Sequence, residues 1–348
     1  MAFSPERWRS ITHGTAKGPG AFALRRLLWL GRGPYAVGSW IHNRKYAKAA
    51  NIHRAGVPVI SVGNLTVGGT GKTPCVEYVA KLLREEDLQI AILSRGYGSE
   101  IGRNDEAMVL EENLPDVPHL QGADRTELAR TAIEELESEC LILDDGFQHR
   151  RLGRDLDIVL IDATDPWGGG YLLPRGGLRE PRSRLSRAGF ILITRVDQAV
   201  DLPKLLEEVA RHAPGKPVAH SVHRPMELVN GSETRPVEDL AGKTVGAFCG
   251  IGNPAAFHRT VADLGAAVSE LKEYPDHHPY SRADVENLTR WAGTLPPEAW
   301  LVTTQKDWVK LRVDALAGRP VYAVRIGLEL THEQESFDRA VRETALQR

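Results

Sequence analysis

Thr66-Val67-Gly68-Gly69-Thr70-Gly71-Lys72-Thr73 is the stretch that decides the fold of this 348-residue chain. Residues 57–62 before it predict a buried parallel strand, and residues 73–86 after it predict a helix with one apolar side. A glycine-rich turn in this place wraps closely around phosphate groups, because backbone N–H groups and the helix N-terminus point at them. Lys72 can reach the terminal phosphates, and the Thr73 hydroxyl can ligate Mg²⁺. The usual pattern has glycine where this chain has Thr66, so we expect Gly68 and Gly69 to supply the flexibility. The stretch therefore predicts a nucleotide-binding site.

The composition is that of an ordinary soluble globular protein. Apolar residues make up 42% and charged residues 26% of the chain, and its length allows two domains. The three cysteines, Cys75, Cys140 and Cys249, stand far apart in the sequence and form no motif. This pattern favours a reducing compartment and argues against a disulfide framework or a structural metal site.

The first 55 residues are strongly basic, although the formal net charge of the chain is only −2. Ten Lys or Arg residues stand there against one acid, Glu6. Within residues 22–41, leucines and aromatic residues are interleaved with arginines, which is typical of a helix lying on an anionic membrane surface. A helix packed on the core with a solvated basic face is the alternative. The sequence has no apolar run long enough to span a bilayer, no signal-peptide pattern and no nucleic-acid-binding motif.

Strand and helix patterns alternate along the rest of the chain, with short connections. All-apolar strands separated by helices predict an α/β fold with a parallel sheet covered on both faces. A second α/β run follows a turn-rich stretch. We therefore expect an N-terminal amphipathic segment at residues 1–55, a nucleotide-binding domain at 56–217, a connector at 218–235 and a smaller α/β domain at 236–348.

Two adjacent carboxylates, Asp144 and Asp145, end the apolar run at residues 141–143. In open α/β sheets, ligands bind at the carboxyl ends of the strands, here beside the phosphate-binding turn. Two neighbouring acids repel each other and favour a bound cation, so at least one of them is expected to hold Mg²⁺ directly or through water.

Other polar segments follow predicted strands. Arg175 and Arg179 stand in a glycine-bearing loop and could clamp phosphate groups, and Lys306 follows a strand of the second domain. Asn104-Asp105-Glu106 is either close to the nucleotide or the start of a helix capped by Asn104 or Asp105. Asp276-His277-His278 forms a turn that could supply acid–base groups. Residues 194–197 (TRVD) have only a weak similarity to the guanine-selecting motif of GTP-binding proteins, and we interpret them as a loop.

The ordered set of motifs resembles the tetraacyldisaccharide 4′-kinase family, inner-membrane enzymes that phosphorylate the lipid A precursor. The matching blocks lie between residues 57 and 310: Gly63-Asn64, Val67 to Pro74, Ser94 to Gly98, Asp105-Glu106, Asp144 to His149, Leu173 to Glu180, Gly250 to Pro254, Asp276-His277 and Lys306-Asp307. The block from Asp144 to His149 is the specific one. The family often has Gly-Asp-Glu-Pro where this chain has Asn104 to Ala107.

The resemblance implies a P-loop NTPase-like domain, a second α/β domain and transfer of the ATP γ-phosphoryl group to a sugar hydroxyl. The acceptor would be a glucosamine disaccharide with four acyl chains. The enzyme would lie at the cytoplasmic face of the bacterial inner membrane, and no obligate protein partner is inferred. Asp105 and His277 would form a catalytic dyad with members in different domains, and the cleft would close on the substrates. Lys72 would hold phosphates, and Thr73, Glu106, Asp144 and Asp145 would surround Mg²⁺. The residues that we expect to contact the substrate are Arg175, Arg179, Asn64, Gln148, His149 and Lys306.

Two other functions remain open at this stage. A P-loop GTPase or metallochaperone-like switch is favoured by residues 194–197 and by the scattered histidines. A soluble small-metabolite kinase is possible if the basic N-terminal segment packs on the core instead of on a membrane.

Overall fold

The computed structural model describes residues 5–46, 50, 52–96, 105–231 and 233–347. By contacts, the chain divides into two compact units, which we call unit 1 (residues 1–97, 114–223 and 328–348) and unit 2 (residues 98–113 and 224–327). In this division, unlike in the predicted one, residues 98–113 cluster with unit 2, residues 328–348 cluster with unit 1, and the expected connector is divided between the units after residue 223. The chain passes between the units within two long strands, β7 (Val218–Asn230) and β13 (Arg319–His332).

Unit 1 is built on a parallel sheet with the strand order β7-β6-β5-β1-β4-β2-β3. The strands other than β7 are β1 (Val59–Asn64), β2 (Ile90–Ser94), β3 (His119–Gln121), β4 (Cys140–Asp144), β5 (Leu156–Asp162) and β6 (Phe190–Thr194). Every residue of β1, β2 and β6 is buried, as expected for parallel strands covered on both faces. The central strand β1 lies between β4 and β5, so its carboxyl end is flanked by theirs.

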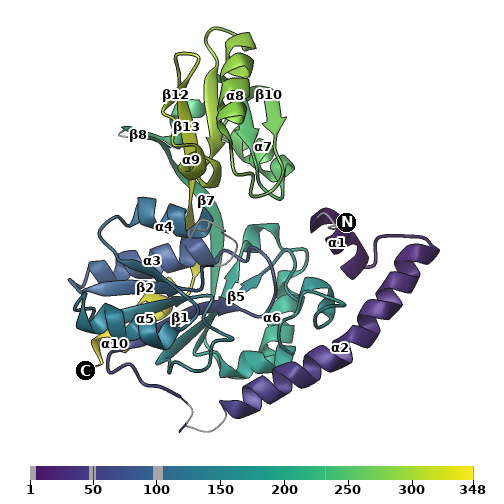
Figure 1. Cartoon of the computed structure of the whole chain (residues 1–348), viewed down its shortest axis with the longest axis vertical. Coiled ribbons are helices and arrows are strands. Elements are labelled where there is room, and N and C mark those ends of the chain that lie inside the picture. The colour runs from purple at the N-terminus through teal and green to yellow at the C-terminus, as the bar shows by residue number, and fades with distance from the viewer. Residues whose placement is uncertain (1–4, 47–49, 51, 97–104, 232, 348) are drawn as a thin grey trace. The chain divides into compact units, whose positions relative to one another are not determined.

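The helices of unit 1 include two N-terminal ones, and the second of them is the long helix at the purple end of the chain in Figure 1. The α-helices of unit 1 are α1 (Pro5–Thr12), α2 (Pro19–Lys45), α3 (Lys72–Arg84), α5 (Arg125–Glu134), α6 (Leu202–His212) and α10 (Gln334–Leu346). The expected helix over residues 22–41 is therefore confirmed and is longer. None of the described helices combines the length and the apolar character needed to cross a bilayer.

Unit 2 has the parallel strand order β10-β9-β11-β13, with β12 antiparallel to β13 and β8 antiparallel to β7. Its strands other than β7 and β13 are β8 (Glu233–Pro236), β9 (Thr244–Cys249), β10 (Ala267–Glu273), β11 (Trp300–Thr304) and β12 (Ala315–Leu316). Its helices are α4 (Asp105–Asn113), α7 (Pro254–Asp263), α8 (Arg282–Thr294) and α9 (Gln305–Leu311). The predicted α/β class is confirmed in both units.

The interpretation of residues 218–235 as a turn-rich connector is wrong. This segment forms β7 and most of β8, which pair as a hairpin around Gly231. Pro225 and alternating polar residues gave it the composition of a loop, but such residues are also found in strands that lie near an edge or are only partly covered.

Candidate functional site

The phosphate-binding turn of unit 1 lies between β1 and α3, as the sequence predicts. Gly71 caps α3 in the left-handed conformation (φ 88°), and a Cβ atom there would come within 2.5 Å of Nε2 of His223. The backbone N–H of Val67 donates to Gly177 O at 2.8 Å, and that of Thr70 donates to Gly68 O at 3.1 Å. These bonds fix the turn, and the first N–H groups of α3 have no partner within the helix itself, so they are donors suited to a phosphate group.

Lys72 and Asp145 face each other at this turn. Nζ of Lys72 lies 3.6 Å from Oδ1 of Asp145, and it donates to Oδ1 of Asn64 at 3.5 Å. Asn64 in turn donates from Nδ2 to Oγ1 of Thr70 at 2.9 Å. Asn64, predicted to contact substrate, thus orients both the lysine and the loop.

Asp144 and Asp145 come together with the turn because β4 is the neighbour of β1, with Val62 paired to Asp144. Asp145 has a positive φ of 54°, and the next residue, Gly146, packs so closely on Ser61 that a Cβ atom would come within 2.6 Å of its Oγ. Burial opposes ionisation of Asp145, but Lys72 and Arg179 hold the pKa of its carboxyl below the usual range. An ionised carboxylate therefore stands beside the lysine.

Arg179, which was expected to clamp a phosphate group, binds the carboxylate of Asp145. Its Nη1 donates to Oδ1 and Oδ2 of Asp145 at 2.9 and 2.7 Å, and to Oε1 of Gln148 at 3.1 Å. Gln148 donates from Nε2 to Asn64 O at 2.8 Å, so it joins the same network. His149 lies nearby, and burial together with Arg125 and Arg154 lowers its pKa to about 4, which leaves it neutral at pH 7.

Arg175 is engaged elsewhere in unit 1. Its Nη1 donates to Thr12 O at 2.6 Å, and its guanidinium lies 4.5 Å from the centre of the Tyr171 ring. The structure therefore uses Arg175 to hold the end of α1, and the prediction that it contacts substrate stays a prediction.

Asp105 and His277 are joined within unit 2. Asp105 is the first residue of α4, which confirms the predicted helix start, and its Oδ2 lies 2.9 Å from Nδ1 of His277. Asn104, predicted as an alternative cap, lies outside the described residues, as do Tyr97 and Gly98 of the matching block. The expectation that the two members of the dyad come from different domains is wrong, because residues 98–113 cluster with unit 2.

Lys310 of α9 contacts the same oxygen of Asp105. Its Nζ lies 3.2 Å from Oδ2 of Asp105 and 3.4 Å from Oδ1 of Asp307, and its side chain is 7% exposed. Burial opposes ionisation of Asp105, yet His277 and Lys310 hold its pKa below the ordinary value. The hydrogen bond to Asp105 raises the pKa of His277 in spite of partial burial. The dyad is thus a charge-assisted pair supported by a lysine.

Glu106 and Lys306 form an ion pair in unit 2, with Nζ 2.7 Å from Oε1. The structure gives Glu106 a cationic partner and describes it in a different unit from Thr73, Asp144 and Asp145. Within the described parts of the chain, no group of three or more His, Cys, Asp or Glu side chains is gathered closely enough to hold a metal ion. The set of magnesium ligands therefore stays a prediction.

Several residues of these sites were missed from the sequence. Thr194 donates to Thr70 O at 2.9 Å and Arg195 donates to Gly69 O, so the segment interpreted as a loop supports the phosphate-binding turn. Arg125, the first residue of α5, is 5% exposed, and burial together with Arg95 lowers the pKa of its guanidinium, while the charges of Asp145 and Asp144 act in the opposite direction. An arginine at a helix start after an Asp cap is the only local signal for it.

Comparisons with known proteins match this chain to one kinase family over nearly its whole length. A family model described as tetraacyldisaccharide-1-P 4′-kinase matches residues 24–345. The chain belongs to this family. A tetraacyldisaccharide 4′-kinase from Anaeromyxobacter sp. (strain Fw109-5) is 40% identical over 356 aligned residues, covering 95% of each chain. Another, from Syntrophus aciditrophicus, is 38% identical and covers 82% of this chain and 83% of its own.

A solved structure supports both the fold and the nucleotide. LpxK from Aquifex aeolicus, crystallised in complex with ATP, is 32% identical, with a TM-score of 0.76 over 92% of this chain and 99% of its own. As a member of the tetraacyldisaccharide-1-P 4′-kinase family, this chain is a P-loop kinase of lipid A biosynthesis that uses ATP with Mg²⁺. The GTPase-like switch and the small-metabolite kinase are not supported.

Proposed function

We propose that this kinase phosphorylates the 4′-hydroxyl of a tetraacylated glucosamine disaccharide 1-phosphate with the residue roles given below. The observation that carries the proposal is the pair of prepared sites. Unit 1 presents a phosphate-binding turn with Lys72 beside ionised Asp145. Unit 2 presents Asp105, a carboxylate held by the imidazole of His277 and the ammonium group of Lys310. The first site would bind the phosphate donor, and the second would activate the acceptor hydroxyl.

Lys72 and the N–H groups of the turn would hold the β- and γ-phosphates of ATP. The transition state of phosphoryl transfer is loose, so positioning and charge neutralisation supply most of the catalysis. The donors in unit 1 suit Mg²⁺, since hydroxyl and carboxylate oxygens are its preferred ligands and Thr73, Asp144 and Asp145 offer them around one turn. Bound Mg²⁺ would neutralise phosphate charge there. Glu106 would join only after leaving Lys306.

Asp105 would accept the proton of the attacking hydroxyl. Both partners approach Oδ2, and in the described part of the chain no hydrogen bond is made by Oδ1. His277 and Lys310 would therefore fix the carboxylate and leave its other oxygen for the substrate. The hydroxyl oxygen forms a bond to the γ-phosphorus, the bond to the leaving ADP oxygen breaks, and the proton passes to Oδ1 of Asp105. Lys72 belongs to unit 1 and Asp105 to unit 2.

The outward faces of α2 suit an anionic membrane surface. The large exposed apolar residues of this helix are Phe22, Leu27, Trp29, Leu30, Val37, Trp40 and Ile41. An arginine lies over each of the three aromatic rings in this set. The distance from the guanidinium carbon to the ring centre is 5.0 Å for Arg26 over Phe22, 5.2 Å for Arg32 over Trp29 and 5.1 Å for Arg44 over Trp40. We infer peripheral attachment at the cytoplasmic face of the inner membrane, where the acylated substrate is, with no protein partner required.

Replacement of Asp105 tests the proposed base. Asp105→Ala should reduce turnover by a factor of at least about 10², whereas the affinity for ATP, measured by titration calorimetry, should stay within about twofold because Lys72 is unchanged. Near-normal turnover by Asp105→Ala would remove Asp105 from the role of base.

A further inference from the structure

The inner face of α2 carries polar residues one helical turn apart. Tyr35, Ser39 and Asn43 follow one another at intervals of four residues, so their side chains lie on one side of the helix. Asn43 is only 4% exposed, in contrast to the apolar residues on the outward faces. A buried amide needs hydrogen-bond partners. Asn43 donates to Oγ of Ser39 at 3.5 Å, and its other side-chain partners come from residues far along the chain.

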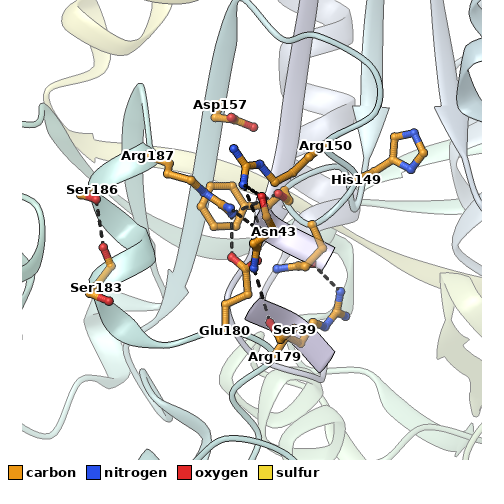
Figure 2. A network of polar contacts seen from close by, with 12 residues as sticks. Ser39, Asn43, His149, Arg150, Asp157, Arg179, Glu180, Ser183, Ser186 and Arg187 are labelled. Carbon is orange, nitrogen blue, oxygen red and sulfur yellow. Dashed lines mark hydrogen bonds and ion pairs between the residues drawn. The ribbon is translucent and has the colours of Figure 1, made fainter. Parts of the chain in front are cut away.

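Asn43 is part of a compact network with Glu180 and Arg187, which Figure 2 shows from close by. Nδ2 of Asn43 donates to Oε1 of Glu180 at 2.9 Å, and Nη2 of Arg187 donates to Oε2 of the same carboxylate at 2.7 Å. Nη1 of Arg187 and of Arg150 donate to Oδ1 of Asn43 at 3.3 and 3.4 Å. Both oxygens of Glu180, which is 3% exposed, are thus satisfied, one of them from α2.

Tyr35 holds the residue before Glu180. Its hydroxyl donates to Arg179 O at 3.0 Å, so two adjacent residues are fixed from one face of α2. Tyr35 fixes the backbone of Arg179, and Asn43 fixes the side chain of Glu180.

The segment ending at Glu180 is in turn bound to the phosphate-binding turn. Arg179 N donates to Leu65 O at 2.8 Å, and Gly177 O accepts from Val67 N at 2.8 Å. The side chain of Arg179 holds both oxygens of Asp145, which faces Lys72. A continuous path of hydrogen bonds and ion pairs therefore runs from α2 to Lys72.

We propose that Asn43 and Tyr35 are positioning residues of the phosphate site. Through them, α2 fixes Arg179 and Glu180, and Arg179 fixes Asp145 opposite Lys72. The inference rests on the proposed function, in which Lys72 holds the triphosphate. It gives α2 two separate tasks, since its outward faces suit a membrane and its inner face completes the ATP site. A displacement of about 1 Å in a reacting group can cost on the order of 10²-fold in rate, so a small shift of Arg179 is enough to matter.

The test compares Asn43→Leu and Tyr35→Phe with the wild-type chain. Asn43→Leu should lower kcat/KM for ATP, and the affinity for ATP, by about tenfold or more, because Glu180 loses its partner on α2. Tyr35→Phe removes only one neutral hydrogen bond and should cost about fivefold. The KM for the acylated acceptor and sedimentation with vesicles containing anionic phospholipid should not change, since the outward faces of α2 are intact.

Asn230→Leu is the matched control. Asn230 is another buried asparagine (9% exposed), and its Nδ2 donates to Asp314 O and Val321 O, all in unit 2. This variant should lose thermal stability but keep its affinity for ATP. The comparison separates loss of a buried amide in general from loss of the one that faces the ATP site.

Three results would overturn the inference. The first is a folded Asn43→Leu variant with ATP affinity and kcat/KM within twofold of wild type. If Asn43→Leu does not fold, wild-type ATP kinetics in Tyr35→Phe would overturn it equally. The third is a wild-type chain that binds ATP no better than Lys72→Met, which would contradict the proposed function and this inference with it, and is thereby distinguishable from the other two.

Discussion

Lys310 and Asp105, which are 205 positions apart in the sequence, form a largely buried ion pair with Nζ 3.2 Å from Oδ2. The carboxylate oxygen that Lys310 contacts is also the one that His277 contacts. This arrangement holds the carboxylate of the proposed base in a fixed orientation through its Oδ2.

Replacement of Lys310 should impair turnover without a large change in the KM for ATP. Lys310→Met leaves the Asp105 and Asp307 carboxylates without their shared cation, and we expect kcat to fall by about 10–10²-fold with little change in KM for ATP. In an Asp105→Ala background the same substitution should cost much less, because Lys310 acts through Asp105. Steady-state kinetics of the four chains would measure this coupling.

Lys272→Met is the control for that cycle. Lys272 also belongs to unit 2, where its Nζ lies 5.7 Å from the centre of the Trp291 ring. Its replacement should leave kcat within about twofold, since a surface contact of this kind is worth about 0.5–1 kcal/mol. Additive effects of Lys310→Met and Asp105→Ala would contradict the coupling.

The conformation of Gly71 should be essential to the phosphate-binding turn. Gly71→Ala places a Cβ atom 2.5 Å from Nε2 of His223 and forces alanine into the left-handed region, which costs roughly 1–2 kcal/mol before the clash is counted. We expect a lower melting temperature and weaker ATP binding. Gly69→Ala is the matched control for stability, because a Cβ atom there meets nothing within 4 Å. Equal melting temperatures for the two variants would contradict the steric argument.

The stabilising effect of His277 should depend on pH. The hydrogen bond to Asp105 raises the pKa of His277 above the ordinary 6.5, so the contribution is fully present below about pH 6.5 and is lost as pH rises through the raised value. For Asp105 the pKa is lowered from 3.8, and its contribution is lost only as pH falls below that range. The difference in melting temperature between wild type and His277→Ala should therefore be largest near pH 5–6 and shrink towards pH 8–9. A difference that grows with pH would be inconsistent with this pair.

The outward faces of α2 should account for membrane binding. Trp29→Ser combined with Trp40→Ser removes two exposed aromatic anchors, and we expect a smaller fraction of protein to sediment with anionic vesicles. High salt should also weaken binding of the wild type to anionic vesicles, because salt screens the attraction between the arginines of α2 and the anionic headgroups. Leu346→Ser, at an exposed leucine of α10, is the control. Equal sedimentation of the two variants would contradict attachment through α2.

The local patterns of the sequence predicted the donor half of the site well. The strand, turn and helix around Lys72 are contiguous, and Asp144 and Asp145 follow directly from the end of a buried strand. Such features depend on residues close together in the chain, where periodicity and turn chemistry carry the signal. The helix beginning at Asp105 was predicted for the same reason.

The remainder depends on contacts between distant residues, which local patterns do not contain. Asn43 and Glu180 are 137 positions apart, and Lys310 is farther still from Asp105. The membership of residues 98–113 in unit 2 follows from the packing of α4 on α9, which includes the hydrogen bonds between Asn113 and Gln305. Short polar residues at such places resemble ordinary surface residues until the fold brings them together.

The central claim is tested most directly by transfer of labelled γ-phosphate from ATP to a purified tetraacyl disaccharide 1-phosphate. The account predicts a product labelled at the 4′ position with the wild-type chain and with Lys272→Met. It predicts strongly reduced transfer with Lys72→Met and with Asp105→Ala. Wild-type protein that hydrolyses ATP without labelling the lipid, or equal labelling by all four chains, would contradict it.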